Sequence, residues 1–176
     1  GNMHESKSLF DAWKYGINDS FHFLFHCSGP KRKHLELFYN KHEAKLGDRL
    51  HIGGGLSNEA WVKVMQSSQI ALVTMSEGSQ EVIMPSKTYS AMMAGQAILA
   101  VAPENSDLVD LIKSANCGWW VAPGDIEGFQ DCLIEIQSNQ NLLLEKRQNA
   151  YQVAHEQFVQ GSLAKKWVAV FESLQS

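Results

Sequence analysis

The sequence has no long apolar run, no signal-peptide pattern and no basic stretch interleaved with aromatic residues. No segment of these residues therefore approaches the length of a transmembrane helix. The missing basic stretch, together with a formal net charge of −4, argues against a nucleic-acid-binding surface. Residues 31–33 form the only basic cluster, and we expect them to start a solvated helix.

Cysteine is scarce. The three cysteines, Cys27, Cys117 and Cys132, are odd in number and lack metal-ligand spacing. They predict reduced thiols and a cytoplasmic protein rather than a disulfide framework. Cys27 follows a predicted strand, where a nucleophile could stand, but no partner base is evident. We favour a small buried hydrophobic residue there.

Several catalytic signatures are also missing. The sequence has no Walker lysine motif, no Gly-x-Ser-x-Gly elbow and no His-Glu-x-x-His helix, and its seven histidines do not cluster at ligand spacing. No carboxylate pair is placed for glycosidase chemistry. We therefore expect no bound metal and no cofactor.

The sequence does contain strand-like and helix-like segments in alternation, which is typical of an α/β domain. Apolar runs predict strands at residues 21–27, 50–53, 70–75, 97–101 and 118–121. Helical patterns lie at residues 7–15, 31–45, 57–66, 86–94, 106–114, about 126–138, 141–157 and 162–174. Strands separated by single helices predict a parallel sheet, with ligands bound at the carboxyl ends of its strands. No repeat or linker interrupts the chain, so we expect one domain over residues 1–176.

Two short features have both a structural and a functional interpretation. Residues 53–55 are three glycines after a strand, but the third position of a dinucleotide fingerprint is Asn58. A tight turn capped by Ser57 is slightly favoured over close approach to a ligand. Trp119 and Trp120 are adjacent in a strand, so their rings face opposite sides, and we favour the core for both.

Residues 84–95 predict a short helix with an unusual start. Ser86 is expected to be its N-cap and Gly95 its stop. Lys87 falls in the first turn, where the helix dipole disfavours a cation by roughly 0.3–1 kcal/mol. A bound anion would reverse that sign. The alternative is that Ser86 only caps and Lys87 points to solvent, and this segment alone leaves both interpretations open.

The run from residue 84 to residue 103 contains Pro-Ser-Lys-Thr-Tyr-Ser, Ala-Met-Met-Ala-Gly-Gln and Ala-Ile-Leu-Ala-Val-Ala-Pro. It resembles the carboxy-terminal half of GT-B glycosyltransferases, most of all retaining family four. The resemblance continues through residues 105–108, 117–118 and 121–125, and extends back through residues 69–73 and 51–53. It implies a Rossmann-like parallel sheet flanked by helices that binds a nucleotide-sugar donor without a metal.

Site residues follow from this resemblance. Ser86 and Lys87 would contact the donor diphosphate, and Gly55 and Leu56 would lie near the base. Many relatives hold the ribose with two glutamates that have seven residues between them.

Val82 and Ser90 occupy those two positions here, so the usual pair is absent. Glu81 is a neighbouring candidate of uncertain role. Near the amino end, Asn2 belongs to a segment resembling a Ser-Gly-Asn variant, and Lys7 is a weak substitute for a phosphate-binding arginine.

The resemblance also implies one more strand than the sequence contains. That strand would precede residue 1 and lie at the centre of the sheet. The simplest explanation is a fragment of a two-domain enzyme, missing its acceptor domain. Exchange of a strand between two chains, or a wrong strand register, are the alternatives.

The expected function is sugar transfer, of hexosyltransferase type, from a uridine or guanosine diphosphate sugar. The acceptor would be a glycan or lipid in cell-envelope polysaccharide synthesis, at the inner face of the membrane. The fragment alone is expected to be inactive, and its catalytic residues are unknown. The alternatives are a GT-B-type nucleotide-sugar epimerase and a non-catalytic flavodoxin-like interaction module.

Overall fold

The five predicted strands are all present in the protein, which is described here by a computed structural model covering residue 11 and residues 20–78 and 84–157. They are β1 (Phe23–His26), β2 (Leu50–Gly53), β3 (Ile70–Thr74), β4 (Ala97–Val101) and β5 (Gly118–Val121). Every strand pair is parallel, which confirms the predicted α/β class. The helices predicted at residues 7–15 and 162–174 lie outside the described residues.

Helices separate the strands as predicted, with ends shifted by one residue or so. They are α2 (Pro30–Leu46), α3 (Asn58–Ser67), α4 (Ser86–Met93), α5 (Asp107–Ala115), α6 (Ile126–Ser138) and α7 (Gln140–Gln157), with a short 3-10 helix, η1 (Gly47–Arg49), after α2. The predicted caps of α3 and α6 are confirmed. Ser57 Oγ accepts a hydrogen bond from the Ala60 amide at 3.3 Å, and Asp125 Oδ1 accepts one from the Gly128 amide at 2.9 Å. Both helices thus begin at a side chain that satisfies a free amide.

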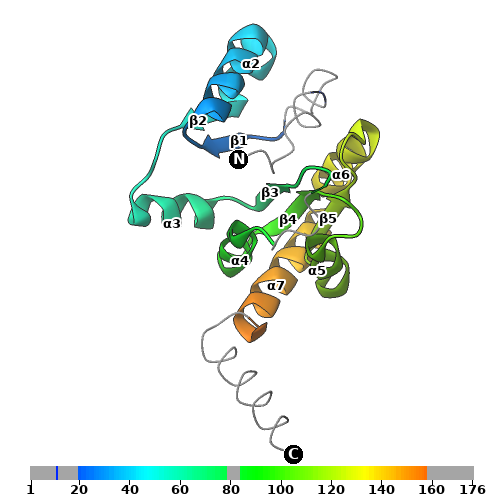
Figure 1. Cartoon of the computed structure of the whole chain (residues 1–176). Coiled ribbons are helices and arrows are strands. Elements are labelled where there is room, and N and C mark those ends of the chain that lie inside the picture. Colours follow the sequence, from blue (N-terminus) through cyan, green and yellow to red (C-terminus); the bar gives the residue numbers. More distant parts are fainter. Residues whose placement is uncertain (1–10, 12–19, 79–83, 158–176) are drawn as a thin grey trace, which may run out of the picture.

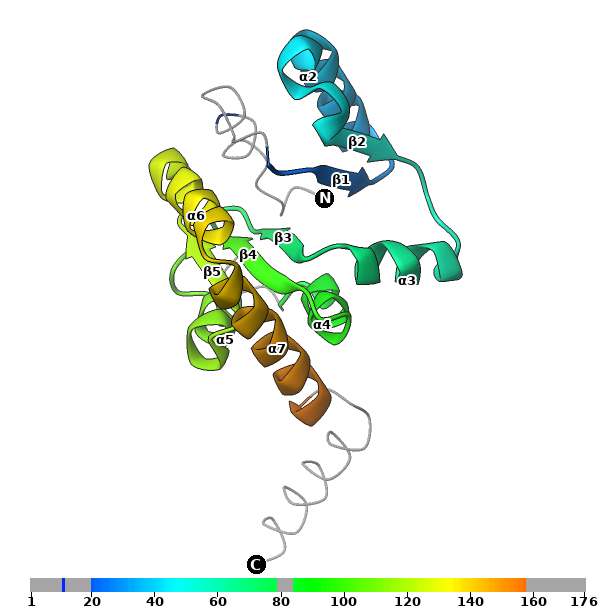
Figure 2. The same ribbon diagram turned by 180° about the vertical axis from the view of Figure 1, so that it is seen from behind.

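The strands form two sheets rather than one. One contains β1 and β2, and the other contains β3, β4 and β5 in that order. In Figures 1 and 2, β1 and β3 are neighbours, with β2 and β4 on their far sides. Among the described residues, no ladder joins β1 to β3. The resemblance implies a further strand at the centre of the sheet, and the described residues contain none there.

Two hydrophobic clusters cover the opposite faces of these sheets. The first draws on both sheets and on α2 and α6, with Leu50, Leu99, Trp119 and Phe129 among its buried members. The second lies against α4, α5 and α7 and contains Met92, Ile98, Ala100, Val109 and Ala150. Figure 2 shows α7 running across the three-stranded sheet between α4 and α5. The core therefore fixes α4 from both the sheet and α7.

The adjacent tryptophans point to opposite faces. Trp119 is buried in the first cluster, and its Nε1 donates to Glu135 Oε2 at 2.6 Å. Trp120 is half-buried against the second cluster and donates to the Ala102 carbonyl at 2.7 Å. The predicted division of the rings between the two faces is confirmed, while Trp120 is only partly within the core.

None of the helices that the structure describes is long and apolar enough to cross a membrane.

Candidate functional site

Helix α4 begins one residue earlier than predicted. Pro85, with φ −56° and ψ 119°, is the N-cap, and Ser86 is the first helical residue. The prediction of Ser86 as N-cap is therefore wrong. Proline fixes φ near the helical value, and its carbonyl accepts the first helical hydrogen bond, from the Thr88 amide at 2.9 Å.

None of the side chains that the structure describes caps this helix. Consequently the amides of Ser86 and Lys87 have no intrahelical acceptor, and both side chains are exposed. The positive end of the α4 dipole is thus left open to an anion.

Thr88 is the most informative residue of the first turn. Its side chain is fully buried, yet among the described residues its Oγ1 has no hydrogen-bond partner. A buried hydroxyl without a partner costs roughly 1–3 kcal/mol. Because the side chain has no exposed surface, a ligand at the start of α4 would not contact this hydroxyl in the present conformation. The sequence analysis did not select Thr88, although the run Ser-Lys-Thr at a helix start was a visible signal.

The carboxyl end of α4 is held firmly. Gly95 adopts φ 73°, its amide donates to the Met92 carbonyl at 3.0 Å, and the Gln96 amide donates to the Ala91 carbonyl at 3.1 Å. This is a Schellman motif, and it confirms the predicted stop. Arg147 Nε of α7 also donates to the Gly95 carbonyl at 2.8 Å. The open amino end therefore belongs to a helix whose position is fixed.

The three glycines at the end of β2 and just after it differ in what a side chain would contact at each position. A Cβ on Gly53 would overlap the His26 ring at the end of β1, and His26 Nδ1 lies 3.3 Å from the Gly54 carbonyl. Arg32 approaches Gly54 as well, while its Nε donates to Glu36 Oε1 at 2.7 Å. The turn interpretation is supported for these two positions. Sequence reasoning missed the His26 contact because it joins residues 28 apart.

Gly55 is different, because a Cβ there would meet nothing within 4 Å. Gly55 and the following Leu56 are both exposed. Protein packing does not require glycine at this position, so the space beside it is open to a ligand. This is where the resemblance predicts the base of the donor.

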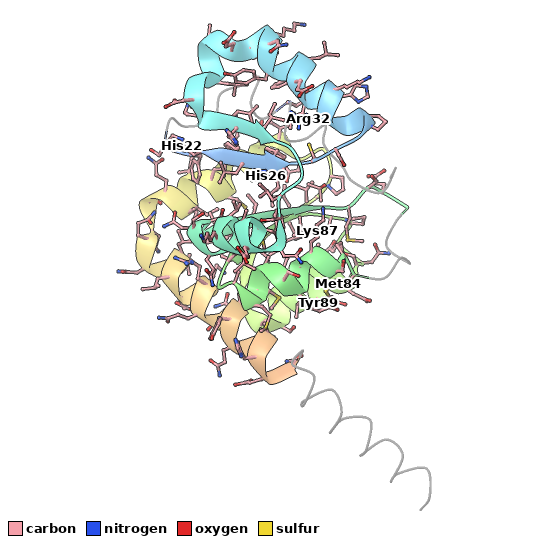
Figure 3. All side chains as sticks on the ribbon, turned by 90° about the vertical axis from the view of Figure 1, so that its left-hand side faces the viewer. His22, His26, Arg32, Met84, Lys87 and Tyr89 are labelled. Atoms are coloured by element: carbon pink, nitrogen blue, oxygen red, sulfur yellow. The ribbon has the colours of Figure 1, made fainter. Side chains whose placement is uncertain are left out.

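The cationic and imidazole groups of these segments belong to two separate sheets. Arg32 lies in the first turn of α2, after β1 of the two-stranded sheet, and Lys87 lies in the first turn of α4, which follows β3 of the three-stranded sheet. Figure 3 shows His26 and Arg32 on the part of the molecule formed by β1 and α2, and Lys87 below them.

The remaining predicted site residues divide into two groups. Ser90 lies one turn after Ser86 on α4 and is exposed, so both hydroxyls share one face of the helix. Four residues lie outside the described part of the chain: Asn2, Lys7, Glu81 and Val82.

The cysteines are all free. Burial raises the pKa of Cys117 to about 11. Burial, followed by the nearby carboxylates of Glu135, Asp131 and Asp125, raises the pKa of Cys132 to about 11 as well. Both thiols are therefore protonated near neutral pH and are poor nucleophiles. Cys27 packs against the first hydrophobic cluster but is only partly buried, so the prediction of a small buried hydrophobic residue is met in part.

Within the described residues, no group of three or more His, Cys, Asp or Glu side chains is placed to hold a metal ion.

The layered parallel fold is that of the carboxy-terminal half of a GT-B glycosyltransferase. The sequence model of the family described as Glycosyl transferases group 1 matches residues 28–156. The chain belongs to this family.

Individual proteins resemble this chain over different lengths. A probable glycosyltransferase, WbjE of Pseudomonas aeruginosa, is 34% identical over 72 residues, which are 41% of this chain and 18% of that protein. Sucrose-phosphate synthase from Thermosynechococcus elongatus matches with a TM-score of 0.76 and 15% identity, over 99% of this chain and 43% of the synthase chain. Anabaena HepE in complex with UDP-glucose matches with a TM-score of 0.73 and 12% identity, over 98% and 46% of the two chains. The chain therefore spans less than half the length of each of these proteins, and the two solved structures show the fold.

Proposed function

We propose that this chain is the donor-binding half of a glycosyltransferase that takes a hexosyl group from a nucleoside diphosphate sugar. The acceptor is a glycan or a lipid-linked sugar of cell-envelope polysaccharide synthesis. The observation that carries the proposal is the first turn of α4, where Ser86 and Lys87 are exposed and no described side chain caps the helix. Membership of the glycosyl transferases group 1 family supports the reaction class, and the UDP-glucose bound to Anabaena HepE supports a uridine donor.

In this proposal the start of α4 binds the diphosphate of the donor. The free amides of Ser86 and Lys87 and the Lys87 ammonium would all donate to phosphate oxygens. As the glycosidic bond of the donor breaks, negative charge grows on the departing nucleoside diphosphate. Donors that are already in place stabilise this charge without reorganisation, so they lower the barrier.

The other donor contacts fit the same assignment. Gly55 and Leu56 would border the base, and Ser90 would offer the ribose a single neutral hydrogen bond in place of a carboxylate. The glycosyltransferase needs no metal, because the helix dipole and Lys87 neutralise the diphosphate. Residues outside this chain supply the acceptor site, so the 176 residues alone bind the donor weakly and do not transfer sugar. The proposal places the enzyme in the cytoplasm at the inner face of the membrane.

Calorimetric titration with UDP and with GDP tests the diphosphate site. Lys87→Ala should weaken binding about tenfold, which corresponds to about 1.4 kcal/mol. Lys41→Ala is the matched control, because Lys41 is equally exposed but lies in the middle of α2. Equal affinity of the parent chain and of Lys87→Ala for both nucleotides would contradict the proposal.

A further inference from the structure

The turn between β2 and α3 is held at both ends and is without partners in its middle. At its start, the Cys27 amide of the neighbouring chain segment donates to the Gly53 carbonyl at 3.3 Å, and no main-chain hydrogen bond between β1 and β2 follows it among the described residues. At its end, Ser57 caps α3. Between these points, the main-chain groups of Gly55 and Leu56 have no hydrogen-bond partner in the part of the chain that the structure describes.

His26, the last residue of β1, fixes the main chain of this turn one residue further. Its Nδ1 lies 3.3 Å from the Gly54 carbonyl oxygen. A carbonyl oxygen only accepts hydrogen bonds, so a neutral ring must carry its proton on Nδ1 for this hydrogen bond to form. The same ring fills the space beside Gly53, where a Cβ would overlap it. His26 therefore holds the start of the turn through a hydrogen bond and through direct contact.

Arg32 restricts the same turn from the first turn of α2. Its Nη1 lies 3.4 Å from the position that a Cβ on Gly54 would occupy, and its Nε donates to Glu36 Oε1 at 2.7 Å. His26 and Arg32 belong to the elements on either side of the loop between β1 and α2, and Figure 3 shows both on the same part of the molecule. Side chains from these two elements thus set the position of Gly54.

We propose that His26 is a positioning residue for the base of the donor, because it fixes the main chain from which Gly55 and Leu56 project. This inference rests on the proposed function, which puts the base beside these two residues. A turn that is already fixed loses less conformational entropy when a ligand binds, so its affinity is higher. The effect is confined to ligands that carry a base, since His26 contacts the turn after β2 and not the start of α4.

Two substitutions of similar shape separate the hydrogen bond from the volume of the side chain. His26→Asn places an amide nitrogen as many bonds from the main chain as Nδ1 and can donate to the Gly54 carbonyl, whereas His26→Leu cannot. Calorimetric titration with UDP and with inorganic pyrophosphate provides the test. We expect His26→Leu to weaken binding of UDP about fivefold and His26→Asn to restore most of that affinity. Neither substitution should change the affinity for pyrophosphate.

His51→Leu is the matched control. His51 lies on β2 and is exposed, and its ring centroid is 5.8 Å from that of His26. It should bind both probes as the parent chain does. Equal affinity of the parent chain and of His26→Leu for UDP would overturn the inference. Equal losses in the Leu and Asn variants, or equal losses for UDP and pyrophosphate, would overturn it as well.

NMR of the parent chain tests the hydrogen bond without any substitution. The nitrogen chemical shifts of the neutral His26 ring distinguish its two tautomers, and we expect the proton on Nδ1. A proton on Nε2 alone would overturn the inference while leaving the proposed function intact. A parent chain that binds neither UDP nor pyrophosphate would instead overturn the proposed function, and this inference with it.

Discussion

A single buried hydroxyl lowers stability at the residue scale. Thr88 Oγ1 has no partner in the described part of the protein, so its desolvation is uncompensated. The side chain has no exposed surface, so this cost concerns the fold and not direct contact with a ligand.

Thr88→Val keeps the shape of the side chain and removes the hydroxyl. We expect the protein to become more stable by about 1 kcal/mol, because a buried polar group without a partner is removed. Urea unfolding measures the change. A loss of stability would contradict an uncompensated hydroxyl at this position.

Ionisation of the buried thiols makes stability depend on pH. The pKa of Cys117 is raised from 9.0 to about 11, so between these values the native thiol is protonated while the unfolded one is ionised. Unfolding then releases a proton, and the free energy of unfolding falls as pH rises through this window.

Cys117→Ala should make the free energy of unfolding fall less steeply over this pH range. The stability difference between the parent chain and the variant should be constant near neutral pH and should shrink as pH rises from 9 to about 11. Urea unfolding at a series of pH values measures it. A difference that stays constant to the top of the range would contradict the raised pKa.

At the scale of elements, one glycine determines how closely two strands pack. A Cβ on Gly118 would lie 1.9 Å from the Ile98 carbonyl oxygen of β4. Gly118→Ala should therefore destabilise the protein by more than about 2 kcal/mol, in the range of severe core substitutions. Gly55→Ala is the control, because a Cβ at Gly55 has open space. Thermal unfolding of the two variants should differ clearly, and equal midpoints would contradict the packing.

The positions of strands and helices could be predicted from the sequence where neighbouring residues determine them. Apolar runs bounded by turn residues located all five strands, and side-chain caps located the starts of α3 and α6. The start of α4 was misplaced because Pro85 takes the capping position without a side-chain hydrogen bond.

Contacts that depend on the tertiary fold could not be predicted in this way. The overlap between His26 and a Cβ on Gly53, and the burial of Thr88, arise only when separate strands and helices pack together. The same holds for Arg147, which reaches the end of α4 from α7. The position of the candidate site was therefore predicted from the sequence, whereas the tertiary contacts around its residues could not be.

At the scale of the whole molecule, burial differs between the two sheets. Every residue of β4 is buried, whereas no residue of β1 is. Local opening is easiest where few apolar contacts are lost. We therefore expect β4 amides that bond within the sheet to exchange hydrogen more slowly than those between β1 and β2. Native-state exchange at increasing urea concentrations measures the order, and faster exchange in β4 would contradict it.

Helix α7 packs against α4, α5, α6, β4 and β5. Its buried Lys146 donates to Asn116 Oδ1 at 2.8 Å, and its Arg147 holds the Gly95 carbonyl at 2.8 Å. A displacement of this long helix would therefore also displace α4, which packs against it. If the proposed function holds, substitutions on α7 would change the affinity for a nucleotide sugar without touching it.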